Sequence, residues 1–457
     1  MKKVLLIGNG AREHAMAVAL KSSKEEIELF VFAGAVNPGL KKLAKDYKVG
    51  ALKSNTAMAS YARETGVDFA VIGPEAPLAE GVVDILEQVD VPCAGPGKDL
   101  AQIETSKSFA RELMLDYKIN GSPEFKVFET MAGVPEWLAH LQGNFVVKPD
   151  GLTGGKGVKV AGDHFNSLNE GLKIIQELFN NGLKVVIEQK LAGQEFSLMS
   201  FCDGEHLLHL PVVQDHKRAF AGDQGPNTGG MGSYSMADFS LPFLDEDDVK
   251  EAQRINQATA MALKKKFSAI GGPASGWNRR GYKGVLYGGF IKTKNGIKLI
   301  EYNARLGDPE AMNVLSLWPP RTFPENESAD FLQVCQAIIS GNLDKLKIDF
   351  QRKATVCKYA VPEGYPDNPV TDQKINVAAV DQKKVRLYYA AVDQREDGLY
   401  LTGSRAVALV ALHEDLYEAE KIVEAEIKKI TGPVFHRADI GTRELIEKKV
   451  KMINDEL

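Results

Sequence analysis

Residues 145–160 read FVVKPDGLTGGKGVKV. Lys148 lies at the end of a β-rich run. A loop with three glycines and a second lysine comes next, and another β-rich run follows. Glycines let a backbone approach a ligand with its N–H groups turned inward, and lysines supply point charges for phosphate oxygens. The pattern therefore predicts a strand–loop–strand flap over a nucleoside triphosphate. The loop residues expected to bind it are Gly154, Gly155, Lys156 and Gly157.

Two common phosphate-binding loops do not fit the sequence. The Walker pattern GxxxxGK[ST] is absent here, and no helix is expected to open after the loop. Near the N-terminus, GNGARE at 8–13 supplies the first two glycines of GxGxxG, but Glu13 stands at the third position. Ala33 and Gly34 stand where an acidic residue would hold a ribose hydroxyl. This combination disfavours a nicotinamide dehydrogenase.

Length and composition indicate a multidomain globular protein. The chain has 457 residues, of which 44% are hydrophobic and 26% charged, and its formal net charge is −5. Such a length suits roughly two to four domains, and without a basic stripe no nucleic-acid partner is expected. No apolar run approaches the roughly 18 residues that a membrane span needs. The four cysteines are scattered without a CxxC pair, which favours buried thiols in the cytoplasm over a zinc site or a disulfide scaffold.

The first hundred residues predict an open α/β domain. Strands that alternate with helices imply a parallel sheet with helices on both faces. Strands are expected at 4–7, 29–33, 67–72 and 91–94, with a helix at 11–20. Ligands of such sheets bind beyond the carboxyl ends of the strands, so the turns that follow are candidate substrate sites, although purely structural turns remain the alternative. The substrate candidates are Gly8, Asn9, Gly10, Glu13 and Glu75.

The rest of the chain predicts a mixed α+β core and a small C-terminal mixed domain. Residues 145–201 indicate a small mobile lid built from strands and a helix at 165–180. Further elements are expected as a connecting helix at 106–117, a helix at 247–267 and strands at 284–293 and 298–303. After a proline-rich break, strands are expected at 354–360, 377–379, 385–391 and 406–411, with a closing helix at 416–430. The predicted domains are 1–105, 106–325 (lid about 122–202) and 326–457.

Glu301, Asn303 and Arg305 form the second strong cluster. Side chains two apart on a strand project from one face, so all three are expected on the same side. A carboxylate and an amide oxygen suit magnesium, which would bridge nucleotide phosphates. Arg305 is suited to grip a substrate carboxylate through two hydrogen bonds. An ordinary edge of surface charges is the competing interpretation.

Two more segments carry candidate residues. Backbone groups after the apolar strand at 185–187 can pair with an adenine edge, and a nearby carboxylate can accept from ribose; these positions are Glu188, Gln189, Leu191 and Glu195. The glycine-dense segment 214–232 is a long loop, and such loops are usually functional. His216 within it is taken as structural. The catalytic candidates are Asp215, Lys217 and Arg305, and the further substrate candidates are Pro226 and Asn227.

Together these segments resemble the ATP-grasp ligases and, among them, the phosphoribosylamine–glycine ligase family. The shared strings are IGNG and REHA within 7–15, GPEAPL at 73–78, QDHKR at 214–218, PNTGGMG at 226–232 and NARLGDPE at 303–310. The likeness runs from residue 4 to about 318 and returns at 437–441. It implies an N-terminal α/β domain, an ATP-grasp core, a mobile lid and a C-terminal domain.

The resemblance also implies a reaction and its cofactors. Glycine, ATP and 5-phosphoribosylamine would give glycinamide ribonucleotide, ADP and phosphate through a glycyl phosphate, in purine synthesis. Lys107 and Lys148 resemble the family's ATP-phosphate lysines, and Mg²⁺ or Mn²⁺ is the expected metal. We expect a monomer or a weak dimer. Another ATP-grasp ligase that uses bicarbonate or formate, and a non-catalytic nucleotide-binding regulator, remain alternatives.

The sequence departs from the family pattern at three places. Thr105 stands where the family has glycine, and no side-chain oxygen suited to a second metal lies near Gly289. The C-terminal glycine–arginine motif is altered to Gly403-Ser404-Arg405. These differences leave the number of metal ions and the part of the C-terminal region open.

Overall fold

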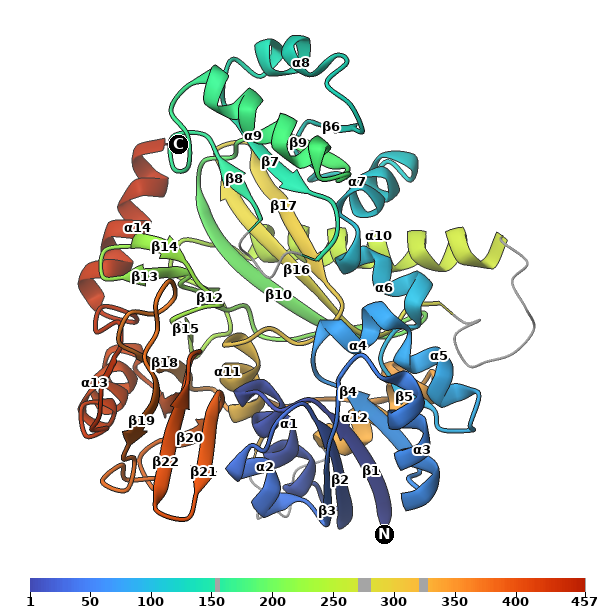
Figure 1. The fold of residues 1–457 in the computed structure, drawn as a ribbon, viewed down its shortest axis with the longest axis vertical. Helices are drawn as coiled ribbons and strands as arrows, with labels where there is room; N and C mark the ends of the chain where they lie inside the picture. The colour runs from blue at the N-terminus through green and yellow to red at the C-terminus, as the bar shows by residue number, and fades with distance from the viewer. Residues whose placement is uncertain (153–156, 270–280, 320–327, 457) are drawn as a thin grey trace.

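The computed structural model arranges the chain around a central antiparallel sheet (Figure 1). It describes residues 1–152, 157–269, 281–319 and 328–456. In Figure 1 the N-terminal sheet lies below the central sheet, a small lid lies above it, and the C-terminal elements lie beside it. Within the described ranges, no helix is long and apolar enough to cross a membrane.

The N-terminal part is a five-stranded parallel sheet in the order β3-β2-β1-β4-β5. Its strands are β1 (Lys2–Ile7), β2 (Ile27–Ala33), β3 (Asp46–Val49), β4 (Phe69–Ile72) and β5 (Cys93–Ala94). Its helices are α1 (Ala11–Lys21), α2 (Pro38–Leu43), α3 (Asn55–Thr65), α4 (Glu75–Glu80) and α5 (Val82–Glu87). The strand order reverses between β1 and β4, where Ile7 pairs with Ile72. The turns after these two strands therefore meet at the crevice where open α/β sheets bind ligands.

The lid is a small unit with its own hydrophobic core. Its antiparallel sheet has the order β6-β9-β7-β8, and the core cluster of Trp137, Phe145, Ile175 and Ile187 is separate from the main core. The strands are β6 (Phe125–Phe128), β7 (Phe145–Pro149), β8 (Lys159–Val160) and β9 (Val185–Gln189), and the helices are α8 (Val134–His140) and α9 (Leu168–Asn180). A separate core suits the predicted lid, whose mobility stays a prediction.

The central sheet carries the strands that face the lid. Its order is β11-β10-β16-β17. The strands are β10 (Gln194–Asp203), β11 (Leu207–His209), β16 (Lys283–Thr293) and β17 (Gly296–Asn303). The helices packed against it are α6 (Lys98–Thr105), α7 (Lys107–Asp116), α10 (Glu246–Ala269) and α12 (Phe331–Ser340). α11 (Glu310–Ser316) follows β17 in the chain and packs against α1 of the N-terminal part. β10 lies inside the predicted lid range, but it pairs with β16 along its whole length, so that range extends too far.

The C-terminal part shares a sheet with the preceding region. The order is β12-β15-β18-β23-β20, with β24 beside β18. These strands are β12 (Gln214–Asp215), β15 (Gly232–Ser235), β18 (Ala354–Pro362), β20 (Arg386–Tyr389), β23 (Val407–His413) and β24 (Val434–Phe435). The pairing of β15 with β18 crosses the predicted boundary at 326. The strand that carries Asp215 is therefore anchored through β15 to the C-terminal part.

The remaining elements complete this region. A hairpin of β13 (Arg218–Phe220) and β14 (Gln224–Asn227) lies within the glycine-dense segment 214–232. The prediction of one long loop there was wrong, because β12, this hairpin and the start of β15 pair much of the segment in short strands. A three-stranded sheet contains β19 (Thr371–Ile375), β21 (Val392–Arg395) and β22 (Gly398–Thr402). The helices are α12 (Phe331–Ser340), α13 (Leu416–Ile427) and α14 (Arg443–Glu456), with a short 3-10 turn at Leu343–Lys345.

The predicted multidomain α/β and α+β architecture is confirmed, with corrections in detail. Residues 377–379, predicted as a strand, lie in a loop and turn directly after β19. β3 was not predicted, because its residues are polar and mostly exposed. The chain ends in α14 rather than in the helix at 416–430. The domain boundaries themselves stay predictions.

Candidate active site

A small polar cavity lies between the central sheet and β12, and it brings together four predicted site residues. Lys217 Nζ lies 3.4 Å from Glu195 Oε2 and 4.0 Å from Glu301 Oε1, and Asp215 lines the same cavity. β16 pairs with β10 on one side and with β17 on the other, so Glu195 and Glu301 lie on the two strands that flank β16 and line the same cavity. Other lining residues are Ser197, Tyr287, Gly289 and Glu310.

The charges around this cavity shift one another's pKa values. The Glu195 carboxylate raises the pKa of Lys217 above its usual range. Burial opposes ionisation of Glu301, but four cations outweigh it and lower its pKa. Burial and the neighbouring Glu310 raise the pKa of Asp215 well above its usual range. The cations that act on Glu301 are Lys217, Lys148, Lys107 and Arg305.

The donor set in this cavity fits a divalent cation. Glu301 and Asn303 stand two apart on β17, although Asn303 lies outside the cavity lining. Burial and, after it, the neighbouring Glu310 carboxylate raise the pKa of Asp215, and a bound cation would offset both effects. Glu310 was not predicted as a site residue. It belongs to the NARLGDPE string, is buried, and accepts a hydrogen bond of 2.9 Å from the Tyr287 hydroxyl.

Lys148 lies in a buried ion-pair network on the lid side of the site. Its Nζ lies 2.7 Å from Glu188 Oε2 and donates a 2.9 Å hydrogen bond to the Ile300 carbonyl. Arg111, which was not predicted, binds the same carboxylate through Nε and Nη2 at 2.6 and 3.0 Å. Burial alone would raise the pKa of Glu188, but Arg111 and Lys148 outweigh it and lower the pKa to about 2. The Glu188 side chain therefore holds cations, and its backbone lies between β6 and β7 in the lid sheet.

Lys107 opens α7 beside the end of β7. Asp150 Oδ1 accepts the N–H groups of Lys107 and Ser108 at 2.6 and 3.2 Å, which caps the helix N-terminus. Lys107 Nζ donates a 2.7 Å hydrogen bond to the Gly151 carbonyl. Lys107 is therefore held at the start of the flap. Gly154, Gly155 and Lys156 lie outside the described residues, and Gly157 is the first described residue after them.

The predicted adenine hinge borders a second cavity, of about 550 Å³. Gln189 and Leu191 line it, together with the turn between β16 and β17. The Gln189 N–H is taken by the Glu124 carbonyl at 2.8 Å. Three lysines border this cavity, namely Lys190, Lys294 and Lys298.

The turn after β1 is closed by Glu13 rather than open to solvent. Glu13 Oε2 accepts the Gly10 N–H at 2.6 Å, and Oε1 accepts from Arg12 Nε at 2.6 Å. Its buried side chain fills the crevice so tightly that a Cβ at Gly8 would lie 2.6 Å from Glu13 Cγ. One backbone amide of this candidate substrate turn is therefore occupied by a protein carboxylate. Asn9 Oδ1 accepts the Gly34 N–H at 3.1 Å.

Arg305 lies where the N-terminal domain meets the central sheet. Its Nε lies 3.4 Å from Glu75 Oε2, and Nη2 lies 3.3 Å from Glu104 Oε1. Arg305 Nε is buried and makes no hydrogen bond within the described residues. Burial opposes ionisation of Glu75, but Arg305 and Arg12 lower its pKa. The structure therefore brings together Glu75 and Arg305, two of the predicted site residues. Arg305 Nε is a guanidinium donor that makes no hydrogen bond to the described residues.

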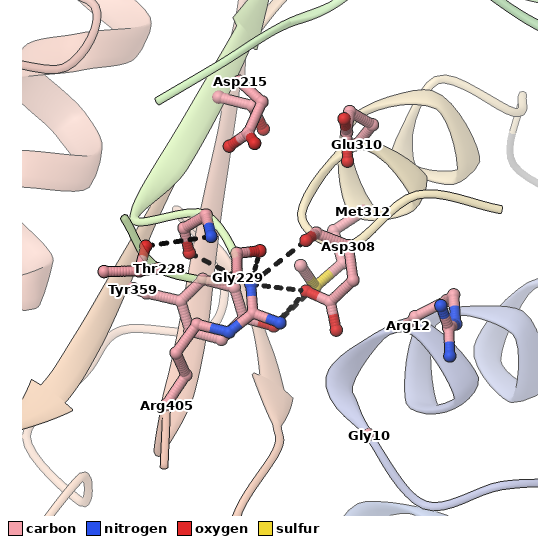
Figure 2. A network of polar contacts seen from close by, with 12 residues as sticks. Gly10, Arg12, Asp215, Thr228, Gly229, Asp308, Glu310, Met312, Tyr359 and Arg405 are labelled. Atoms are coloured by element: carbon pink, nitrogen blue, oxygen red, sulfur yellow. Dashed lines mark hydrogen bonds and ion pairs between the residues drawn. The ribbon is translucent and has the colours of Figure 1, made fainter. Parts of the chain in front are cut away.

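Arg405 extends the site into the C-terminal domain (Figure 2). Its Nη1 donates to the carbonyls of Gly229, Gly230 and Asp308 at 2.6, 3.0 and 3.1 Å. Its guanidinium also lies over the Tyr359 ring, 4.5 Å from the centroid. The altered glycine–arginine motif thus holds the glycine-dense loop. The predicted substrate residues Pro226 and Asn227 lie on β14, outside the lining of the polar cavity.

Known proteins share this architecture over nearly the whole chain. A phosphoribosylamine–glycine ligase of Methanocaldococcus jannaschii is 46% identical over 99% of this chain and 99% of its own. A crystal structure of the Thermotoga maritima phosphoribosylamine–glycine ligase matches with a TM-score of 0.77 at 26% identity, covering 96% of this chain and 100% of that one. The biotin carboxylase domain of Hydrogenobacter thermophilus 2-oxoglutarate carboxylase, solved with MgADP, shares the fold alone: TM-score 0.70 at 14% identity over 100% of this chain and 94% of that one.

Family models match three consecutive parts of the chain. The N domain of phosphoribosylglycinamide synthetase matches residues 2–104, its ATP-grasp (A) domain matches 105–311, and its C domain matches 355–443. These matches cover the turn after β1, Lys107, Lys148 and Arg405. The chain therefore belongs to the phosphoribosylglycinamide synthetase family of ATP-grasp ligases.

Proposed function

We propose that this chain joins glycine to 5-phosphoribosylamine through a glycyl phosphate intermediate, with the residues described above in defined roles. A glycine carboxylate oxygen attacks the γ-phosphorus of ATP and ADP leaves. The amine nitrogen of phosphoribosylamine then attacks the carbonyl carbon, phosphate leaves, and the nitrogen loses a proton. Family membership and the full-length match to phosphoribosylamine–glycine ligases support this reaction as a step of purine synthesis.

One observation carries the site assignment. Lys217 Nζ lies 4.0 Å from Glu301 Oε1, and Lys148 Nζ donates to the carbonyl of the preceding residue, Ile300. These two lysines, with Lys107 and Arg305, lower the pKa of Glu301 against the effect of burial. Phosphoryl transfer needs positive charge around the transferred group, because charge spreads over its oxygens in the transition state. In the proposal Lys107 and Lys148 hold the triphosphate, together with the flap glycines and Lys156.

Glu301 and Asn303 are proposed to hold the metal ion, Mg²⁺ or Mn²⁺. The cation would neutralise phosphate charge when bound. The remaining assignments follow from position. Gln189 and Leu191, with the Glu188 backbone, would flank adenine, and Glu195 would meet ribose. The lid would exclude water from the acyl phosphate.

Arg305 is proposed to bind the glycine carboxylate, since its buried Nε makes a 3.4 Å ion pair to Glu75 without a hydrogen bond among the described residues. Asp215 and Lys217 line the adjoining cavity and would orient the reacting groups. Phosphoribosylamine would lie toward the sheet crevice. Its proposed neighbours are Gly8, Asn9, Gly10, Glu13, Glu75, Pro226 and Asn227.

The test is a phosphate-release assay with ATP, glycine and fresh phosphoribosylamine, omitting each in turn. Phosphate release is expected only with all three. Release with bicarbonate or formate in place of glycine would indicate another ATP-grasp ligase instead. Lys148→Met is expected to abolish product formation while the circular dichroism spectrum stays unchanged, and normal turnover of that variant would contradict the ATP-site assignment.

We also propose that the enzyme works in the cytoplasm as a monomer or a weak dimer, without nucleic acid or membrane partners. Cys93, Cys202, Cys335 and Cys357 are all buried free thiols, which suits a reducing compartment. Sedimentation at several protein concentrations would measure the oligomeric state.

A further inference from the structure

Arg111 and Lys148 compete for one buried carboxylate. Glu188 Oε1 accepts from Arg111 Nε at 2.6 Å, while Oε2 lies 3.0 Å from Arg111 Nη2 and 2.7 Å from Lys148 Nζ. The Ile300 carbonyl is shared in the same way, at 2.7 Å from Arg111 Nη2 and 2.9 Å from Lys148 Nζ. All three charged side chains are less than a tenth exposed. Such a network is costly to break, because it leaves a buried charge unpaired.

The network joins four elements on which the proposed ATP site depends. Arg111 comes from α7, one turn after Lys107. Glu188 is the next-to-last residue of β9, and Lys148 lies on the adjacent strand β7, where Lys148 pairs with Val186. Ile300 precedes Glu301 on β17. Arg111 therefore contacts both sheets of the site without lining either cavity described above.

The charge balance indicates what Arg111 contributes. To bind a phosphate, Lys148 Nζ must give up at least part of its contact with Glu188 and with the Ile300 carbonyl. With Arg111 present, Glu188 keeps two charge-assisted hydrogen bonds after the lysine leaves. Without Arg111, Glu188 would have only Lys148 as its cation, and the lysine would be held away from the nucleotide.

We propose that Arg111 is a positioning residue, which neutralises Glu188 so that Lys148 is free to engage the triphosphate. This rests on the proposed role of Lys148 in binding ATP. In this proposal the Glu188 side chain restrains Lys148. That role is separate from the backbone contact predicted for the adenine hinge. A purely structural role for Arg111 would lower stability without a selective effect on ATP.

The experiment measures binding of a nonhydrolysable ATP analogue by calorimetry, and the KM values for ATP and glycine. Arg111→Met is expected to weaken analogue binding and raise the ATP KM by roughly tenfold or more, as when a residue that orients a ligand group is lost. The glycine KM should stay unchanged. Adding Glu188→Gln to this variant removes the charge that traps Lys148, so binding should recover to within about threefold of wild type.

Two further variants keep the test decisive. Arg111→Lys retains a cation and should bind the analogue within about threefold of wild type even if Arg111→Met folds poorly. Lys358→Met removes a buried cation that pairs with Glu420 and Glu424 in the C-terminal domain, so it should lower the Tm without changing the ATP KM.

Two results would overturn the proposal. One is a double variant that binds no better than Arg111→Met, and the other is unchanged analogue binding in Arg111→Met. Unchanged binding in Lys148→Met would instead remove the ATP-site assignment on which it rests.

Discussion

Arg405 Nη1 lies 3.2 Å from Asp308 Oδ1, and this ion pair links the C-terminal domain to the central region. The Tyr359 hydroxyl donates to the same Asp308 oxygen at 2.6 Å. On the other side, a Cβ added to Gly10 would lie 3.8 Å from Asp308 Oδ2. Figure 2 shows Asp308 between Arg405 and the first turn of α1. Asp308 is thus a meeting point of the three parts of the chain that the family models match.

Arg405→Met is expected to raise the KM values for glycine and phosphoribosylamine by roughly tenfold, with the ATP KM changed much less. The substitution removes the hydrogen bonds from Arg405 to the carbonyls of Gly229 and Gly230, which hold the glycine-dense segment, and to the carbonyl of Asp308. Steady-state kinetics with each substrate varied would measure this. Arg254→Met, which removes an exposed arginine on α10, is the control. Equal kinetics for both variants would show that the loop does not need Arg405.

Glu301→Gln is expected to raise the metal concentration needed for half-maximal activity by roughly tenfold or more, because a neutral amide binds a divalent cation less well than a carboxylate. Activity would be titrated with Mg²⁺ and with Mn²⁺. Glu246→Gln, at the exposed start of α10, provides a control that removes one carboxylate from the surface. Unchanged metal dependence would argue against Glu301 as a ligand.

His14 makes stability depend on pH at the contact between the N- and C-terminal parts. Its Nδ1 accepts the Tyr389 N–H at 3.0 Å, and its ring stacks on the Tyr389 ring. Burial lowers the pKa of His14 to about 4. Because the folded value lies below the unfolded value, the stabilisation is complete above about pH 6.5 and is lost as the pH falls toward 4. The loss amounts to roughly 3 kcal/mol.

His14→Gln keeps an acceptor but does not titrate in this range. Its free energy of unfolding should fall below that of wild type at pH 7.5, and the difference should narrow by pH 4.5. Urea unfolding of both proteins at several pH values would measure it. A difference that stays constant with pH would rule out His14 as the titrating group.

The fold could be predicted wherever apolar patterning is strong. β1 and β4 are buried on both faces and read as apolar runs. β3 has no such signal, because an edge strand exposes most of its side chains. The assignment of β10 to the lid failed for another reason. Sequence proximity to β9 suggests a common sheet, but β10 pairs with β16, more than 80 residues later.

Site residues could be proposed from the sequence only where a motif or a predicted strand marked them. Asp215 and Lys217 belong to the string at 214–218, whereas Glu195 and Glu301 were proposed from their places on or after predicted strands. The four residues line one cavity, and their roles stay predictions. Arg111 lies on an amphipathic helix, where a single arginine gives no local sign that it is buried. Its partner Glu188 shows the same limit: sequence reasoning gave it an adenine contact, and only the fold shows its carboxylate between two cations.

Gly230 is expected to be irreplaceable, because it packs against the site. Its φ is +106°, and an added Cβ would lie 2.5 Å from Pro309 Cδ and 2.7 Å from Asp215 Oδ1. Gly222 on the neighbouring hairpin has a φ of +73°, yet its nearest neighbour would be Gln224 Cγ at 3.9 Å. Both alanine variants suffer backbone strain of roughly 1 kcal/mol or more, but only Gly230→Ala must also displace Asp215 or Pro309.

Gly230→Ala should therefore lower turnover by roughly a hundredfold, as expected when catalytic groups are misplaced, whereas Gly222→Ala should keep near-normal turnover. Urea unfolding should show both variants destabilised, with a larger loss for Gly230→Ala. Both variants carry the same kind of backbone strain, so a difference in turnover between them reports the displacement around Asp215. If Gly230→Ala were as active as Gly222→Ala, the loop around Asp215 would tolerate displacement, and the catalytic role proposed for that carboxyl would fail with it.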